Sequence, residues 1–186
     1  MTDDPDLVVL LGEDGTELGT GGKLAAHRPP GHLHRAFSVF LFDGQGHVLL
    51  QRRADDKPLF AGLWSNSCCS HPRPGEAVAD AAQRRVREEL GLDCDPEEVG
   101  LFDYHADDPV SGLAERERVH VFAGMIGGPP VPDPREVSDV RLVPFADVFA
   151  GVAQDPASFS PWLAGTANEV RPWWQRTFGA AGNGPP

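Results

Sequence analysis

Apolar residues gather in short runs along the chain, separated by segments rich in glycine, proline, aspartate and asparagine. The runs lie at 7–11, 36–42, 48–50, 99–104, 119–126 and 137–143. Runs of this length between turn-forming residues predict β-strands. Two of them, 36–42 and 48–50, flank Asp43-Gly44-Gln45-Gly46 and therefore predict a β-hairpin.

The segment 76–90 has the pattern of an amphipathic helix instead. Val78, Ala82, Val86 and Leu90 recur at helical spacing, and Gly91 follows as a stop signal. Arg84/Glu88 and Arg85/Glu89 stand four residues apart, where opposite charges support a helix.

Residues 145–152 and 161–178 predict two further helices, whereas 25–34 has the composition of a loop and 55–74 that of a loop with a short extended piece. No repeat and no linker divides the chain. We therefore expect an α+β fold, with a single domain over 1–178 built on a mixed β-sheet with flanking helices. The tail 179–186 is expected to be disordered.

Charge and composition narrow the function classes. The 186 residues include 28 acidic and 16 basic side chains, giving a net charge of −12. Such a charge opposes binding to nucleic acid and to anionic membranes. No apolar run approaches the roughly 20 residues of a membrane helix, and the N-terminus is acidic, so a cytoplasmic protein is expected. The odd set Cys68, Cys69 and Cys94 fits reduced thiols.

Three histidines and two glutamates are candidate metal ligands: His27, His34, His71, Glu115 and Glu117. Two positions apart on a strand, the two glutamates would share one face. Imidazoles with carboxylates suit a transition metal or magnesium better than a structural zinc ion. Spacing alone does not bring the five together, and a single histidine is more often a loop or surface residue.

The segment Cys68-Cys69-Ser70-His71 could also form half of a zinc site. No second cysteine or histidine pair follows at a workable spacing, which argues against this interpretation.

The helix and the loop before it resemble the Nudix box, in which a loop–helix–loop presents glutamates to a metal bound to diphosphate. The matching positions are Ser70, Glu76, Arg84-Arg85, Glu88-Glu89 and Gly91. Ser70 stands where the box usually has glycine, and Arg84-Arg85 stand where it usually has Arg-Glu.

With four further segments, the loop before the helix is similar to type 1 isopentenyl-diphosphate isomerases. The five segments, in family order, are 33–37, 51–54, 64–72, 112–117 and 159–162. The resemblance covers about residues 8 to 168. The chain departs from the family pattern at Ser70, a glycine in the family, and in carrying Arg116 and Arg118 on the Glu115/Glu117 strand.

The resemblance implies two metal sites and a substrate. One divalent ion, Mn²⁺, Mg²⁺ or Zn²⁺, would be held by His27, His34, His71, Glu115 and Glu117. A Mg²⁺ held with the help of Glu89 would bind the diphosphate of an isoprenoid substrate. Cations around that diphosphate would be Arg53, Lys57 and Arg85.

The implied reaction converts isopentenyl diphosphate to dimethylallyl diphosphate and back through a tertiary carbocation. Cys69 and Glu117 would move protons on opposite faces of the five-carbon unit, with Tyr104 assisting. Trp162 would face the cation, as aromatic rings can. The family also favours a monomer.

Two other functions remain open at this point. A Nudix pyrophosphohydrolase acting on a nucleotide or isoprenoid diphosphate would activate water at the helix glutamates. A non-catalytic interaction domain could use the same scaffold. Arg84-Arg85 and the cysteine loop argue against the first, and the full set of candidate ligands argues against the second.

Overall fold

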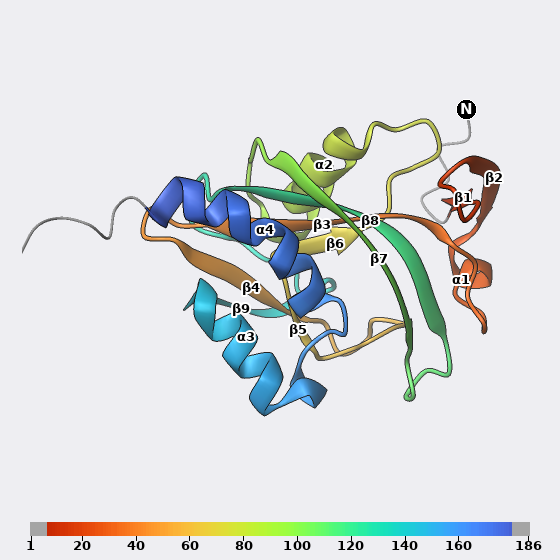
Figure 1. Ribbon diagram of the computed structural model, residues 1–186. Coiled ribbons are helices and arrows are strands. Elements are labelled where there is room, and N and C mark those ends of the chain that lie inside the picture. The colour runs from red at the N-terminus through yellow and green to blue at the C-terminus, as the bar shows by residue number, and fades with distance from the viewer. Residues whose placement is uncertain (1–6, 180–186) are drawn as a thin grey trace, which may run out of the picture.

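The computed structural model describes residues 7–179, in which one nine-stranded sheet carries helices on both faces (Figure 1). The strands are β1 (Leu7–Leu11), β2 (Glu17–Gly22), β3 (His34–Phe42), β4 (His47–Arg53), β5 (Trp64–Ser65), β6 (Cys68–Ser70), β7 (Glu97–Asp107), β8 (Ala114–Met125) and β9 (Val137–Pro144). The helices are α1 (Lys23–Ala26), α2 (Val78–Leu90), α3 (Phe145–Gln154) and α4 (Leu163–Phe178), with a 3₁₀ turn at Pro156–Ser158. The α+β fold with a mixed sheet is confirmed.

Strand β3 lies at the centre of the sheet. It pairs in parallel with β8 along its whole length, from His34 opposite Glu117 to Phe42 opposite Met125. Its other edge pairs antiparallel with β1, β6 and β4 in succession. Strand β7 continues the sheet beyond β8, and β9 continues it beyond β4. Short strands from distant parts of the sequence thus flank the start of β3.

Side chains alternate along β3 between two apolar layers. Phe40 and Phe42 pack in the cluster that includes Val170 and Trp173 of α4. Val39 and Leu41 pack on the opposite face in the cluster that includes Val86 of α2. Figure 1 shows α2 on one side of the sheet and α3 and α4 on the other. Because both faces are covered, β3 is apolar almost throughout.

The hairpin of β1 and β2, followed by α1, lies at one end of the sheet (Figure 1). A small cluster of Val9, Leu11 and Leu33 joins it to the body. An ion pair of 2.6 Å between Glu13, in the turn of this hairpin, and Arg116 of β8 also links the hairpin to the sheet. The loop prediction for 25–34 missed α1, whose single turn is too short to show helical periodicity.

Every predicted strand overlaps an observed one, but β4, β7 and β8 extend beyond the predicted runs, and β2 was not predicted. The short strands β5 and β6 lie in the segment 55–74, where a short extended piece was expected. The helix expected from residue 76 begins at Val78, because Glu76 turns its carboxylate onto the N–H of Arg73 and the guanidinium of Arg84. Among residues 7–179 no helix has the length and apolar character needed to cross a membrane. The tail expected to be disordered lies, from residue 180 onward, outside the described residues.

Candidate active site

Three histidines and one glutamate converge at the start of β3. His34 is the first residue of β3 and pairs directly with Glu117 of β8, whereas His27 directly follows α1 and His71 follows β6. One ligand atom from each of the four lies within 4.8 Å of the others. Oε1 of Glu117 lies 2.8 Å from Nε2 of His71 and 3.3 Å from Nε2 of His34. The sheet therefore assembles four of the five ligands that the resemblance implies.

Hydrogen bonds to backbone carbonyls orient two of these rings. Nδ1 of His27 lies 2.6 Å from the carbonyl oxygen of Lys23, and Nδ1 of His34 lies 2.7 Å from that of His32. A carbonyl only accepts, so each Nδ1 carries the proton and each Nε2 faces the centre. Burial lowers the pKa of His27 and takes that of His71 to about 3. Nδ1 of His71 is buried without a partner among the described residues.

This donor set fits a divalent cation. Burial is the largest influence on the pKa of His34 and lowers it, but the hydrogen bond to Glu117, the charge of that carboxylate and the hydrogen bond to His32 together outweigh burial and raise the pKa of the ring. A proton on Nε2 of His34 can satisfy only one neighbour at a time. A divalent ion can satisfy all three imidazoles and the carboxylate together, and imidazole with carboxylate is a donor set that such ions accept.

Glu115 lies beside this group rather than within it. The hydroxyl of Tyr104 on β7 contacts Oε2 of Glu115 and lies 2.8 Å from Oε2 of Glu117. Burial and the neighbouring Glu117 raise the pKa of Glu115 to about 8. Burial would also raise the pKa of Glu117, but hydrogen bonds from His34 and His71 hold it well below its usual range. The two neighbouring carboxyl groups therefore differ in their affinity for a proton. The role of Glu115 as a fifth ligand stays a prediction.

Cys69 and Cys68 face opposite sides of the sheet, as neighbours on a strand do. Cys68 is fully buried in the core beneath α2. Sγ of Cys69 faces the site, 3.8 Å from Nη1 of Arg53 and 3.9 Å from Oγ of Ser65. Burial raises the pKa of the Cys69 thiol to about 11, so the group is protonated near neutral pH. Because the two thiols diverge, this segment does not form half of a zinc site.

Trp162 forms a fixed aromatic wall next to Cys69. Its Nε1 donates to Oδ1 of Asn66 at 3.0 Å. The centroid of its ring lies 5.4 Å from the ring centroid of Phe60 and 5.8 Å from that of Tyr104. The guanidinium carbon of Arg53 is 5.5 Å from the ring centroid. Arg53 also donates to the carbonyls of Leu59 and Phe60. Arg53 is thus held on the cysteine side of the site.

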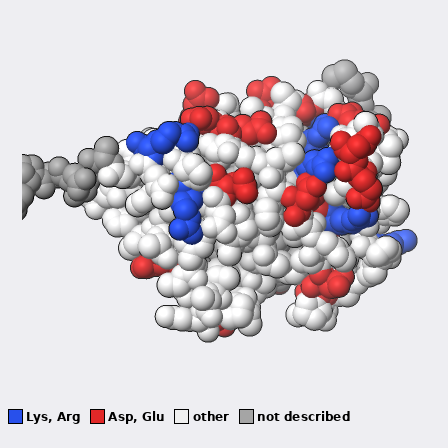
Figure 2. All heavy atoms as spheres, viewed as in Figure 1, with Lys and Arg blue, Asp and Glu red and all other residues white. Residues whose placement is uncertain are grey.

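Two cavities meet at the site. The first, of about 80 Å³, is lined by Cys69, Glu115, Glu117 and Trp162 among others, and the second is about 280 Å³. Residues lining both cavities are Lys23, Lys57, Ser70, His71 and Arg85. Three cations therefore mark the junction. On the face seen in Figure 2, acidic groups lie mainly along the upper and right-hand parts, with basic groups among them.

Sequence reasoning missed Lys23. It precedes His27 by four residues, one turn of helix, so α1 places both on the same side. That spacing was the available signal. Burial lowers the pKa of Lys23 and of Lys57. An arriving anion would offset that cost of burying positive charge.

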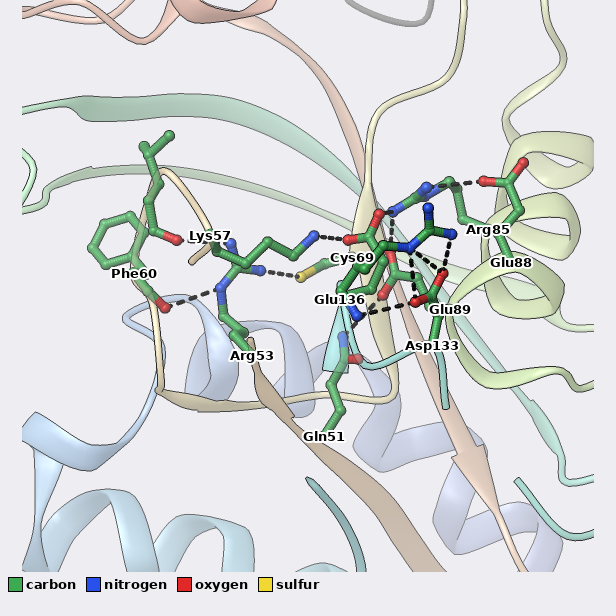
Figure 3. A network of polar contacts seen from close by, with 12 residues as sticks. Gln51, Arg53, Lys57, Phe60, Cys69, Arg85, Glu88, Glu89, Asp133 and Glu136 are labelled. Carbon is green, nitrogen blue, oxygen red and sulfur yellow. Dashed lines mark hydrogen bonds and ion pairs between the residues drawn. The ribbon is translucent and has the colours of Figure 1, made fainter. Parts of the chain in front are cut away.

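Glu89, which was predicted to help hold Mg²⁺, is buried and does not line the second cavity. It is 2% exposed and accepts hydrogen bonds from Nη2 of Arg85 at 2.5 Å and from Nε2 of Gln51 at 3.2 Å (Figure 3). The carboxylates that line the second cavity are Glu88 and Glu136. Glu136, also missed by sequence reasoning, contacts both Lys57 and Arg85.

Comparison with known proteins shows the family of the chain. The NUDIX domain family model matches residues 32–163. An isopentenyl-diphosphate Delta-isomerase of Streptomyces avermitilis is 49% identical over 169 residues, covering 89% of this chain and 84% of that protein. One from Nocardia farcinica is 50% identical over 157 residues, covering 84% and 90%. The chain belongs to the isopentenyl-diphosphate Delta-isomerase family.

Solved structures show the shared scaffold of this NUDIX family member. A crystal structure from Deinococcus radiodurans superposes with a TM-score of 0.70 at 20% identity, covering 87% of this chain and 97% of that chain. A MutT protein from Methanosarcina mazei gives 0.57 at 16% identity, covering 81% and 96%. At such identities the likeness establishes the fold alone. The isomerase family assignment depends on the sequence relatives.

Proposed function

We propose that this chain interconverts isopentenyl diphosphate and dimethylallyl diphosphate by moving protons through a tertiary carbocation. The proposal rests on one observation: Cys69 and Glu117 line the same small cavity, together with Trp162. Cys69 lies on β6 and Glu117 on β8, and these two strands pair with opposite edges of β3. Two proton-transfer groups facing one apolar unit are what a double-bond shift requires.

The junction cations support binding of the substrate diphosphate. Lys57, Arg85 and Lys23 line both cavities, so a diphosphate at the junction would leave the five-carbon unit in the first cavity. Arg53 would neutralise charge from the cysteine side. Mg²⁺ would accompany the diphosphate, and the resemblance assigns Glu89 of α2 to it, a carboxylate that is paired with Arg85 in this structure.

The second ion, Mn²⁺, Mg²⁺ or Zn²⁺, would be held by His27, His34, His71 and Glu117, with Glu115 as the fifth ligand. When bound, it supplies fixed positive charge that keeps Glu117 ionised and immobile. Tyr104 holds both carboxylates through its hydroxyl and can relay a proton between them.

The reaction needs one group to give a proton to the terminal CH₂ carbon and another to take one from the carbon bearing the CH₂O group. The first step makes a tertiary cation and the second forms the new double bond. Cys69 and Glu117 serve as this pair, and the reverse reaction exchanges their roles. Trp162 stabilises the cation through its ring face without acting as a nucleophile. The small, sheltered cavity keeps water from capturing it.

The direct test is to incubate the protein with isopentenyl diphosphate and Mg²⁺ and to look for the dimethylallyl isomer. In heavy water, recovered substrate and product should both carry deuterium. Release of phosphate without isomerisation would identify a pyrophosphohydrolase instead and would overturn the proposal.

We also propose a cytoplasmic monomer that binds neither nucleic acid nor membranes. The net charge of −12 and the free thiols of Cys68, Cys69 and Cys94 support this. Sedimentation of the purified protein tests the monomer directly.

A further inference from the structure

The carboxylate of Glu136 lies against two cations of the junction (Figure 3). Its Oε2 contacts Nζ of Lys57, and its Oε1 lies 3.1 Å from Nη2 of Arg85. The three side chains are sheltered, with Glu136 25%, Lys57 19% and Arg85 18% exposed. Glu136 contacts the same two cations that a bound diphosphate would contact. Because dissolved salt screens sheltered charges less than charges on the open surface, Glu136 and the diphosphate would also repel each other appreciably.

The backbone fixes Glu136 in this position. Its carbonyl accepts a hydrogen bond of 3.0 Å from the N–H of Ala54, next to the end of β4. Its own N–H donates to the carbonyl of Asp133, whose N–H donates to the carbonyl of Glu89 on α2, both at 2.9 Å. The loop thus bridges β4 and α2. The carboxylate can rotate but remains at the junction when a ligand enters.

Arg85 is contacted by three carboxylates at once. Glu88 lies 2.9 Å from its Nη1, and Glu89 and Glu136 lie 2.5 Å and 3.1 Å from its Nη2. Lys23, Lys57 and Arg85, the three cations at the junction of the two cavities, are called the diphosphate seat below. The three carboxylates offset much of the positive charge of these cations. The seat is therefore much less positive than its cations alone suggest.

The mixture of cations and carboxylates at the seat should bind metal-free diphosphate and Mg²⁺-bound diphosphate with different affinities. A metal-free diphosphate carries several negative charges and meets Glu136 as a like charge at short range. A diphosphate chelated to Mg²⁺ carries less negative charge, and the ion offers Glu136 a counter-charge.

We propose that Glu136 makes the diphosphate seat selective for magnesium-complexed diphosphate over the metal-free form. This rests on the proposed function, because it refines which form of the substrate headgroup the same site accepts. The selectivity comes from a repulsive contact as well as attractive ones.

Inorganic diphosphate is a suitable ligand for the test. It is titrated calorimetrically, with and without Mg²⁺, into wild type, Glu136→Gln and Asp133→Asn that have been loaded with divalent ion and freed of excess metal. Metal analysis after each titration checks that the bound ion is retained. Asp133→Asn is the matched control, since it removes one negative charge from the same loop while its carboxylate pairs directly with Arg135 and acts on Arg85 only through a weaker charge interaction.

Glu136→Gln should bind metal-free diphosphate about tenfold or more tightly than wild type, because one like charge at the seat is gone. Binding of the magnesium complex should stay the same or weaken, so the preference for the complex falls by at least the same factor. Asp133→Asn should keep the wild-type preference. An equal change under both conditions, or no change, would overturn the proposal.

Glu136→Asp provides a second variant if the glutamine protein does not fold. It keeps the charge but withdraws it by one methylene, so a smaller gain in metal-free binding is expected, and a wild-type preference would overturn the proposal. Wild-type isomerase activity distinguishes failure of the proposed function from failure of the Glu136 selectivity alone. If wild type neither isomerises nor binds diphosphate, the proposed function fails; if it does both while Glu136→Gln keeps the preference, only the selectivity fails.

Discussion

The Nε2 atoms of His34 and His71 lie 3.1 Å apart, although the two residues are 37 positions apart in the sequence. At that distance two imidazole lone pairs repel unless a proton or a cation lies between them. Nδ1 of His34 is already committed to the carbonyl of His32. A neutral His71 with its proton on Nε2 can donate to His34 or to Glu117 but not fully to both, whereas a divalent cation among these groups can bind both imidazoles and the carboxylate together.

Removal of the divalent ion should lower both activity and stability. An ion at 100 times its Kd stabilises the folded protein by about 3 kcal/mol, so chelation should lower the Tm by several degrees. His71→Ala should abolish that metal-dependent shift. His105→Ala, a change at a half-exposed histidine on β7 outside the site, should preserve it. Metal analysis showing active, chelator-treated protein without any ion would contradict the assignment.

Replacement of the two cysteines should separate chemistry from packing. Cys69→Ala should lower turnover by about 10²–10⁴-fold or more, since it removes a proton-transfer group. Cys68→Ala leaves a small void under α2 and should cost about 1 kcal/mol of unfolding free energy with little loss of turnover. Thermal unfolding and metal content must match wild type for the Cys69 result to count. A selective loss of turnover at Cys68 would reverse the assignment of the two thiols.

Much of the sheet and part of the site were predictable because they depend on local pattern. The apolar run 36–42 reads as a strand because both faces of β3 are covered. The spacing of Glu115 and Glu117 placed both on one face, and Tyr104 now joins them. In contrast, β2 has three glycines and is mostly exposed, so only its pairing with β1 reveals it.

Other parts of the site depend on contacts that no local pattern encodes. Lys57 and Glu136 stand 79 positions apart, and either one alone reads as an ordinary solvated charge. The helical spacing of Arg85 and Glu89 was visible, but the burial of Glu89 behind Arg85 follows from the loop that packs against α2. Sequence could name these groups as charged but could not show that they are sheltered.

The pKa of Cys69 predicts a pH dependence of stability. Burial raises the pKa from 9.0 to about 11, so the folded protein holds this proton more tightly than the unfolded chain does. The resulting contribution is fully present below pH 9 and is lost as the pH rises through about 11. Compared with Cys69→Ala, wild type should lose about 2–3 kcal/mol more unfolding free energy over that window. Denaturant unfolding of both proteins at matched pH values measures the difference; parallel curves would show an unshifted thiol.

Charge reversal on α2 should distinguish the diphosphate seat from ordinary surface charge. Arg85→Glu places a fourth carboxylate among Glu88, Glu89 and Glu136, so the KM for isopentenyl diphosphate should rise at least tenfold and inhibition by diphosphate should weaken. Arg87→Glu makes the same change on the same helix at a side chain that is 62% exposed and pairs only with Asp93 among the described residues. That variant should keep the wild-type KM. Since repulsion could also loosen the helix, Arg85→Met provides a neutral replacement, for which a smaller rise in KM is expected with unfolding close to wild type. If both Arg85 variants fold and bind substrate and diphosphate as wild type does, the cluster around Arg85 serves the stability of α2 and not substrate binding.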